Sequence, residues 1–317
     1  MLVQFMVRNV LSFKEETVLD MTAINAYKEH ESNLIDNRNE TKEKFLRVAA
    51  IYGANASGKS NLYMAMRYFQ KIIAESLNNA DEDSMIAIER YYEPFRFEEK
   101  LDNSEFQIIE MVDNYEYKYG FEYNKQCIVA EWLYRKSLET KRTITIFERS
   151  LNDVEFGALV RKECDLYKNQ VPAETLLLSF FNKLKMKTNV FSDVYASIMD
   201  ILVVPTDFCE DIRLLKAVLP SIIDLEKEKL VNFLSAIDTG IKDIGYDDSE
   251  KEIHFFTVHK GKDNNDYRLS LFYESEGTIK SIMLFMYARN AVLNNKSIFV
   301  DELNIKLHPL LLKFIVD

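Results

Sequence analysis

The stretch IYGANASGKSNL, residues 51–62, decides how the rest of the sequence is interpreted. It contains the pattern G-x-x-x-x-G-K-[ST], which Gly53, Gly58, Lys59 and Ser60 satisfy. In such a loop, backbone N–H groups converge on phosphate oxygens, the lysine reaches the β- and γ-phosphates, and the hydroxyl ligates Mg²⁺. A loop that merely turns the chain would explain the glycines but not a Lys-Ser pair. The flanking segments have to decide between the two interpretations.

The segments on either side supply the context that a phosphate loop requires. FLRVAAIYG, residues 45–53, is a short and nearly continuous apolar run, which predicts a strand buried on both faces. LYMAMRYFQKIIAESL, residues 62–77, has apolar positions at helical spacing. The predicted order is therefore strand, glycine loop and helix, and this order favours phosphate binding.

Composition places limits on the class of protein. With 317 residues and 47% hydrophobic content, the chain can form one large domain or two smaller ones. Its longest apolar runs, such as residues 198–204, are too short to cross a bilayer, and the N-terminus lacks the pattern of a signal peptide. Cys127, Cys164 and Cys209 have neither a disulfide pattern nor metal-ligand spacing. We therefore expect a reduced cytoplasmic protein that does not contact a membrane.

The charge balance is acidic, with a formal net charge of −11. This argues against a globally basic nucleic-acid binder, although a local basic groove is compatible with it. The one lysine-rich piece, NKLKMKTN at residues 182–189, is interpreted as a solvated helix end.

Hydrophobic patterning divides the chain into regions. LVQFMV and TVLDM in the first twenty residues are expected to be strands, and residues 21–44 a surface loop. Alternating runs over 90–149 predict an antiparallel sheet: YYEPFRFEE, SEFQIIEMV, YEYKYGFEYN, CIVAEWLYRK and TITIFER. Residues 171–241 are mainly helical, and strands return at 252–260 and 267–274. We expect an α/β fold with a mixed core sheet, an antiparallel β-subdomain and a helical insertion, divided as 1–150, 151–245 and 246–317.

A second motif lies in KSIFVDELNIKLHP, residues 296–309. Four apolar residues precede Asp301 and Glu302, and this pattern predicts a buried strand with two acidic residues at its C-terminal end. Ligands of α/β sheets bind at that end of the strands. Asp301 would hold the Mg²⁺ held by Ser60, and Glu302 would orient the attacking water. Two solvated acids are the simpler interpretation of this stretch alone. The loop at 53–60 favours the functional one.

A third motif, SEGT at residues 275–278, precedes a strongly apolar helix that begins about twenty residues before the acidic strand. A glycine-bearing helix N-terminus is an anion site, but the same residues also form a good helix cap. Taken alone, the cap is the preferred interpretation.

The order of these motifs resembles the ABC-type ATPases of the branch that contains RecF, SMC and overcoming-lysogenization-defect proteins. GANASGKS is similar to that group's G-x-N-G-x-G-K-S loop, with Asn55 at the asparagine and Ala56 in place of a glycine. ESEGT resembles the signature motif, with Ser275 and Gly277 retained, and SIFVDE resembles Walker B followed by the catalytic glutamate. The opening residues 2–16, the EWLY run and the LHP at 307–309 are also similar to this group. Close look-alikes are ATPases of phage-defence and abortive-infection operons.

The resemblance implies a fold, a ligand and an assembly. It implies an ABC-type P-loop domain that hydrolyses ATP with Mg²⁺, in which Lys59 and Glu302 are catalytic and Ser60 and Asp301 hold the metal. It also implies a head-to-tail homodimer that forms when ATP binds and separates after hydrolysis. This cycle would control an effector, such as a separate nuclease, or a process on nucleic acid. The net charge gives no indication of nucleic-acid binding. The expected ATP contacts are Gly53, Asn55, Ala56, Ser57, Gly58, Lys59, Ser60 and Asn61, with Ser275 and Gly277 from the second copy.

The sequence departs from the family pattern in two respects. Members follow Walker B with a strand that bears a switch histidine, whereas this sequence ends at Asp317, so we expect a C-terminally truncated fragment. His308 belongs to the LHP element and is not assigned that role. The glutamine of the Q-loop is not assigned either, although Gln107 is a candidate.

Other functions stay open at this point. A non-hydrolysing nucleotide sensor that regulates a partner would keep the same motifs. A small-molecule kinase or GTPase would need neither the signature helix nor a glutamate after Asp301, and the guanine-reading N-K-x-D is missing from the sequence. A transporter subunit is disfavoured because the stretches between the motifs are long.

Overall fold

In the computed structural model the chain forms two compact units, Met1–Ile201 and Leu202–Asp317. The structure describes residues 1–24, 31–35, 43–77, 85–97, 102–204, 212–236, 240–249 and 252–302. The boundary between the units falls inside the segment expected as a helical insertion, residues 151–245. Each unit is described separately.

The first unit is built on a seven-stranded antiparallel sheet with the order β2-β1-β5-β6-β7-β8-β9. The expected antiparallel sheet is therefore confirmed, and the two N-terminal strands join it. The alternation of large apolar and polar residues places one face of each strand in the core. The strands are β1 (Leu2–Arg8), β2 (Thr17–Asp20), β5 (Ser104–Val112), β6 (Tyr115–Tyr123), β7 (Ile128–Ser137), β8 (Thr143–Ser150) and β9 (Asp153–Phe156).

The run YYEPFRFEE was predicted to be a strand, and this prediction was wrong for its described part. Helix α2 (Ala87–Arg90) precedes it, and residues 91–97 contain no strand. Pro94 cannot donate to a sheet ladder, and the backbone around it bonds to the turn after β1 instead. Leu11 N donates to Glu93 O at 2.6 Å, and Phe95 N donates to the side chain of Asn9 at 3.0 Å.

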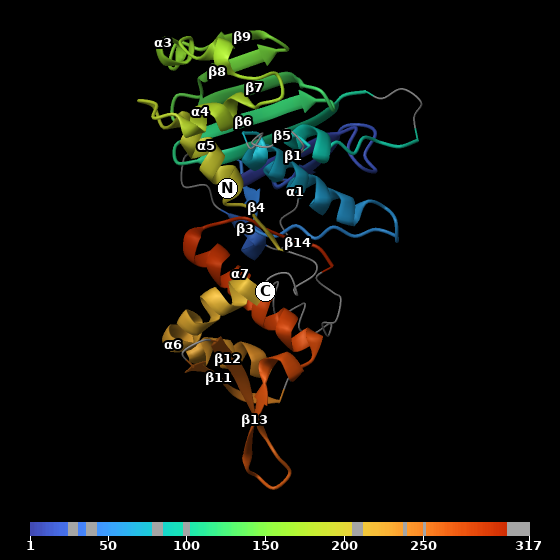
Figure 1. Ribbon diagram of the computed structural model, residues 1–317, viewed down its shortest axis with the longest axis vertical. Coiled ribbons are helices and arrows are strands. Elements are labelled where there is room, and N and C mark those ends of the chain that lie inside the picture. Colours follow the sequence, from blue (N-terminus) through green and yellow to red (C-terminus); the bar gives the residue numbers. More distant parts are fainter. Residues whose placement is uncertain are drawn as a thin grey trace. The chain divides into compact units, whose positions relative to one another are not determined.

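Three helices cover the apolar face of this sheet: α1 (Lys59–Glu75), α4 (Leu177–Lys183) and α5 (Val190–Met199) (Figure 1). Phe69 of α1 is fully buried among four rings of the sheet. Its ring centroid lies 5.6 Å from Phe5, 5.7 Å from Phe106 and 5.7 Å from Phe121, with which it is nearly parallel. Aromatic packing of this kind fixes α1 on the sheet.

A buried carboxylate joins the sheet to α4. Glu131 of β7 is fully buried and accepts hydrogen bonds from Tyr119 Oη and from the backbone N–H groups of Leu177 and Leu178. Helix α4 has no side-chain cap of its own, so this glutamate satisfies its first turn. Burial raises the pKa of Glu131 to about 7, although its hydrogen bonds and the Arg149 guanidinium oppose the shift.

The segment before the glycine loop differs from its prediction as a buried strand. Only β4 (Phe45–Leu46) is a strand, and it pairs with β3 (Leu34–Ile35). Residues 47–57 lie exposed, including Ile51 at 48% and Tyr52 at 90%. A strand buried on both faces needs neighbours on both edges, and no described strand pairs with residues 47–53. The apolar run alone therefore did not predict the local structure.

The second unit has its own apolar core between helices α6 (Ile212–Ala236) and α7 (Glu276–Asn294) and a three-stranded sheet. The strands of that sheet are β11 (Ile241–Ser249), β12 (Glu252–Lys260) and β13 (Asp266–Ser270). A kink divides α6 at Glu226, whose backbone is non-helical. Arg289 of α7 contacts the Glu226 carboxylate with two nitrogens, which ties the two helices together.

A short parallel pair of strands also belongs to the second unit. It consists of β10 (Leu202–Val204) and β14 (Ile298–Val300), so the expected strand SIFV is confirmed. The other short helices within the described residues are η1 (Glu31–Asn33), α3 (Arg161–Cys164), η2 (Lys168–Gln170) and η4 (Leu271–Tyr273).

The structure also bears on the lysine-rich segment and on the prediction that the chain does not cross a membrane. The lysine-rich piece is a solvated helix end, because α4 ends at Lys183 and the side chains of Lys183, Lys185 and Lys187 are exposed. Cys209 and the LHP element with His308 lie outside the described residues. Within the described ranges, none of the helices combines the length and the apolar character needed to cross a bilayer.

The raised pKa of Glu131 predicts a pH dependence of stability. The folded protein holds the Glu131 proton up to about pH 7, whereas an unfolded glutamate loses it near its ordinary value of 4.5. The folded state therefore binds more protons between these values, and the free energy of unfolding should fall as pH rises from about 5 to 8. The loss should amount to about 3 kcal/mol at most. Urea unfolding at several pH values measures it.

Glu131→Gln provides the comparison for this experiment. Burial also raises the pKa of Glu110 to about 7, so the variant should have a shallower pH slope but not a flat one. An unchanged slope would contradict the assignment to Glu131.

Candidate functional site

The glycine loop leads directly into α1, and Lys59 is the first residue of that helix. Its ammonium group folds back over the loop and donates to the carbonyls of Gly53 and Ala54, both at 2.8 Å. The N-cap, Gly58, has φ of 95°, a left-handed conformation that favours glycine. The loop is thus closed around the lysine, which lies where the helix dipole is positive.

Two serine hydroxyl groups approach the glycines of the loop closely. A Cβ atom on Gly53 would lie 2.5 Å from Ser57 Oγ, and one on Gly58 would lie 2.8 Å from Ser12 Oγ. The turn at residues 9–13 therefore packs against the C-terminal end of the loop. Asn9 fixes this turn, since its side chain donates to Asp102 O at 2.6 Å.

Ala56 occupies the position where similar loops carry a glycine, and its backbone shows the reason. Its φ is 63°, in the left-handed region that costs an L-residue about 1–2 kcal/mol. The alanine therefore holds a strained conformation that a glycine would adopt freely. Strain of this kind is found at ligand-binding loops.

The start of α1 is open to a ligand. Gly58 provides no side-chain cap, and the first turn contains no acidic residue. Ser60 is exposed, while Lys59 and Asn61 are half-buried. Free N–H groups, a lysine and a hydroxyl at one helix N-terminus can bind a phosphate group.

In the second unit, β14 ends at Val300 and presents Asp301 and Glu302 as expected. Glu302 has φ of 52°, and its N–H donates to Asp301 Oδ1 at 3.0 Å. Its carbonyl accepts a hydrogen bond from Lys280 Nζ at 2.8 Å. The Glu302 side chain is exposed, so its carboxylate is accessible to solvent.

The SEGT motif forms the start of α7. Ser275 is the N-cap, and its Oγ accepts a hydrogen bond from Thr278 N at 3.1 Å and lies 2.9 Å from Thr278 Oγ1. The interpretation of this motif as a cap is confirmed. Ser275 is nevertheless exposed and Gly277 half-exposed, so both remain accessible to a partner.

Glu274, directly before the cap, anchors this turn to the sheet of the second unit. One of its carboxylate oxygens accepts a hydrogen bond from Thr257 Oγ1 and lies 2.5 Å from His259 Nε2. Both partners belong to β12, and the Glu274 side chain is only 8% exposed. The entry into α7 is therefore fixed on the sheet.

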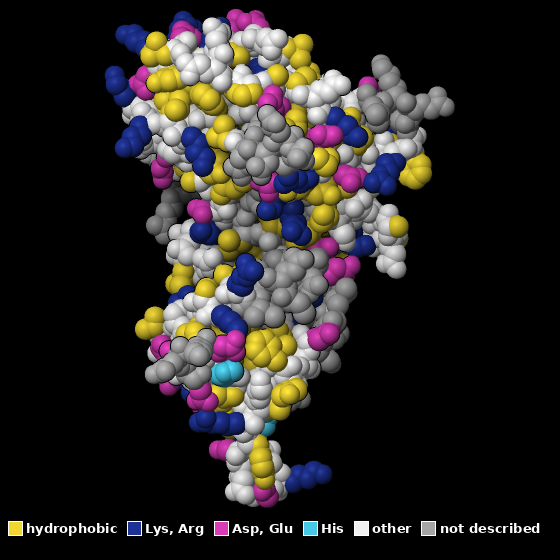
Figure 2. Space-filling model, in the orientation of Figure 1, with side chains coloured by type: hydrophobic (Ala, Val, Ile, Leu, Met, Phe, Trp, Pro, Cys, Tyr) yellow, Lys and Arg dark blue, Asp and Glu magenta, His cyan; other side chains and the backbone are white. Residues whose placement is uncertain are grey.

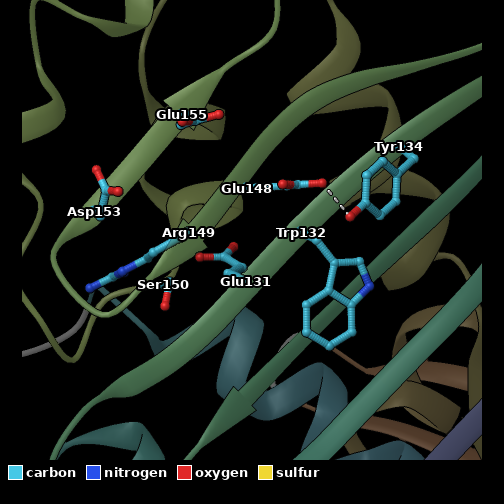
Figure 3. A pocket seen from close by; sticks show the side chains of 8 residues that line it. All are labelled: Glu131, Trp132, Tyr134, Glu148, Arg149, Ser150, Asp153 and Glu155. Atoms are coloured by element: carbon cyan, nitrogen blue, oxygen red, sulfur yellow. Dashed lines mark hydrogen bonds between the residues drawn. The ribbon is translucent and has the colours of Figure 1, made fainter.

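An open pocket of about 260 Å³ lies over β7, β8 and β9 of the first unit, and none of the predicted site residues lines it (Figure 3). Glu148, Asp153 and Glu155 line it together with Trp132 and Tyr134, whose hydroxyl donates to Glu148 at 2.6 Å. Glu131 and Arg149 also line the pocket, and four acidic side chains against one cation disfavour a nucleotide phosphate.

The structure brings the predicted residues together in two groups, one in each unit. The first unit holds Gly53, Asn55, Ala56, Ser57, Gly58, Lys59, Ser60 and Asn61 in one loop and the helix start that follows it. The second unit holds Ser275 and Gly277 at the start of α7, and Asp301 and Glu302 after β14. Lys280 connects the two elements of the second unit.

Sequence reasoning missed Ser12, Thr257, His259 and Lys280 as parts of these groups. Lys280 gave a usable signal, because a lysine that interrupts the strongly apolar stretch IKSIMLF is unusual for a buried helix. Ser12, Thr257 and His259 are distant in sequence from the residues they contact, and nothing local marks them.

Comparison with known protein families gives a match. The family model described as AAA domain, putative AbiEii toxin, Type IV TA system matches residues 48–317. This range contains the glycine loop, the SEGT motif and the acidic strand. Among curated proteins, none matches the sequence.

The strain at Ala56 predicts that Ala56→Gly stabilises the first unit by up to about 1 kcal/mol, because relief of the left-handed strain exceeds the added entropy of the unfolded glycine. Thermal and urea unfolding measure the change. Ala74→Gly, at an exposed position inside α1, is the matched control and should destabilise by about 1 kcal/mol. Equal destabilisation by both variants would contradict the role assigned to φ at Ala56.

Proposed function

This chain belongs to the family of AAA domains described as putative AbiEii toxins of Type IV TA systems, and on this premise we propose that it is an ABC-type ATPase that hydrolyses ATP to ADP and phosphate. ATP-dependent pairing of two copies would act as the switch. The family supports nucleotide binding; the ABC-type assembly and the switch are the finer part of the proposal.

The observation that carries the proposal is the position of Lys59 at the start of α1. Its ammonium group already closes the loop through two carbonyls, next to a helix N-terminus without an acidic residue. Phosphate oxygens are stronger acceptors than carbonyls for an ammonium donor. Lys59 would therefore exchange these carbonyls for the β- and γ-phosphates of ATP.

The proposed metal ligands fit Mg²⁺ chemically. Mg²⁺ prefers hard oxygen ligands and keeps several waters, and the Ser60 hydroxyl and Asp301 carboxylate supply oxygen donors. When bound, Mg²⁺ would neutralise charge on the transferring phosphoryl group. Glu302 would orient and polarise the attacking water through its exposed carboxylate.

The second copy enters through the start of α7. Ser275 and Gly277 are accessible and lie at a helix N-terminus, a position suited to a γ-phosphate. We place them against the ATP of the other copy, so that ATP holds the dimer and hydrolysis releases it. Because both copies would contribute to each ATP site, hydrolysis of the γ-phosphate would separate the dimer into monomers.

The family description points to a toxin–antitoxin role, and we place the proposed switch in abortive infection or a related antiviral defence. The output would act through an effector, such as a separate nuclease. Nucleic acid is a weaker candidate partner, since the net charge is −11 and side chains of both signs are interspersed on the face seen in Figure 2.

Glu302→Gln tests the proposal. The variant should bind ATP normally, lose turnover by about 10²–10⁴-fold, and accumulate as a dimer with ATP and Mg²⁺. Lys59→Ala is the matched control and should lower ATP affinity at least about tenfold, without forming the dimer. Nucleotide binding, phosphate release and sedimentation velocity give the three readouts. Hydrolysis by Glu302→Gln at the unmutated rate would remove the proposed role of Glu302.

Substitutions at Ser275 separate the cap from the contact with the second copy. Ser275→Asp and Ser275→Asn both preserve the cap, so helix stability should change little, whereas Ser275→Ala should cost about 1 kcal/mol. In the Glu302→Gln background, only the negative charge of Ser275→Asp should abolish the ATP-dependent dimer. A dimer that forms equally well with Asp would argue against Ser275 facing a phosphate.

A further inference from the structure

Lys280 lies in the second turn of α7, and its side chain points to the acidic end of β14. It is 6% exposed, and its Nζ donates to Glu302 O at 2.8 Å. The contact joins the helix that begins at Ser275 to the turn that presents Glu302.

A buried lysine requires compensation in the folded protein. Burial lowers the pKa of Lys280, because it disfavours the ammonium form, while the nearby carboxylates of Glu302 and Asp301 oppose this shift. Lysine is almost never fully buried without such partners. The acidic turn therefore provides the compensation that the buried Lys280 ammonium group needs.

The turn at Glu302 is in a conformation that needs support. Its φ of 52° lies in the left-handed region, which is strained for a residue with a side chain. Asp301 Oδ1 accepts its N–H, and Lys280 Nζ donates to its carbonyl. The N–H and the carbonyl of Glu302 are thus both held by hydrogen bonds, which restrains the backbone from which the Glu302 side chain projects.

We propose that Lys280 is a positioning residue that holds the Glu302 turn and so aims the Glu302 carboxylate. Its ammonium group donates to the main-chain carbonyl of Glu302, so it acts on this glutamate through the backbone. The proposal deepens the proposed function and rests on it, since it assigns Lys280 to support of the same catalytic glutamate.

The same geometry links the helix start to the acidic turn. Ser275 and Lys280 are five residues apart on one rigid helix, an axial distance of about 7.5 Å. Glu274 fixes the beginning of this helix on β12 through Thr257 and His259. The residue that caps α7 and the lysine that supports Glu302 are therefore held by the same anchored helix.

The first test uses the full chain without nucleotide, so it does not depend on ATPase activity. Amide hydrogen exchange of the peptide containing Asp301 and Glu302 should become at least about threefold faster in Lys280→Met. Lys280→Arg, which keeps a donor, should lie closer to the unmutated protein. Lys242→Met, at an exposed position on β11, should leave the exchange unchanged. Unchanged exchange in a folded Lys280→Met protein would overturn the proposal.

The second test separates turnover from binding. Lys280→Met should lower kcat about 10–100-fold and leave the ATP dissociation constant within about threefold, with partial recovery in Lys280→Arg. An unchanged kcat, or a kcat that falls only in parallel with lost ATP binding, would overturn a positioning role. The unmutated protein and Lys242→Met could release no phosphate while hydrogen exchange still becomes faster in Lys280→Met. In that case the proposed ATPase function would be wrong, and the support of the turn by Lys280 would still be correct.

Discussion

Phe69 connects the glycine loop to the rest of the first unit. The loop continues into α1, and α1 is held on the antiparallel sheet by the ring of Phe69 among Phe5, Phe106 and Phe121. Since the helix cannot tilt without breaking this aromatic layer, the direction of its N-terminus is fixed. The position of Lys59 and the open N–H groups at the loop follow from that packing.

Helix α7 has the corresponding role in the second unit. Its first residue is capped by Ser275, its entry is anchored to β12 through Glu274, and its second turn supports Glu302 through Lys280. Three polar contacts on one helix thus determine how the SEGT motif and the acidic turn are presented. The apolar remainder of α7 packs in the core with α6 and makes this arrangement rigid.

Sequence reasoning succeeded where a local pattern determines local structure. The strands β5 to β8 were predicted from alternating runs rich in Tyr, Phe and Ile, α1 from helical spacing, and the cap at Ser275 from its residue type. It failed where residues elsewhere in the chain determine the local structure. Residues 48–52 are apolar yet exposed, because no described strand pairs with them, and Pro94 interrupts a run whose pattern otherwise predicts a strand. The roles of Ser12 and Lys280 depend on contacts distant in sequence.

The central claim is that this chain hydrolyses ATP with the loop at Lys59 and the carboxylate of Glu302. Phosphate release by the unmutated chain under single-turnover conditions, with Mg²⁺ and with EDTA, tests it most directly. We predict release of one phosphate per bound ATP with Mg²⁺ and none with EDTA. Tight ATP binding with no phosphate released under either condition would contradict it and identify the protein as a nucleotide sensor.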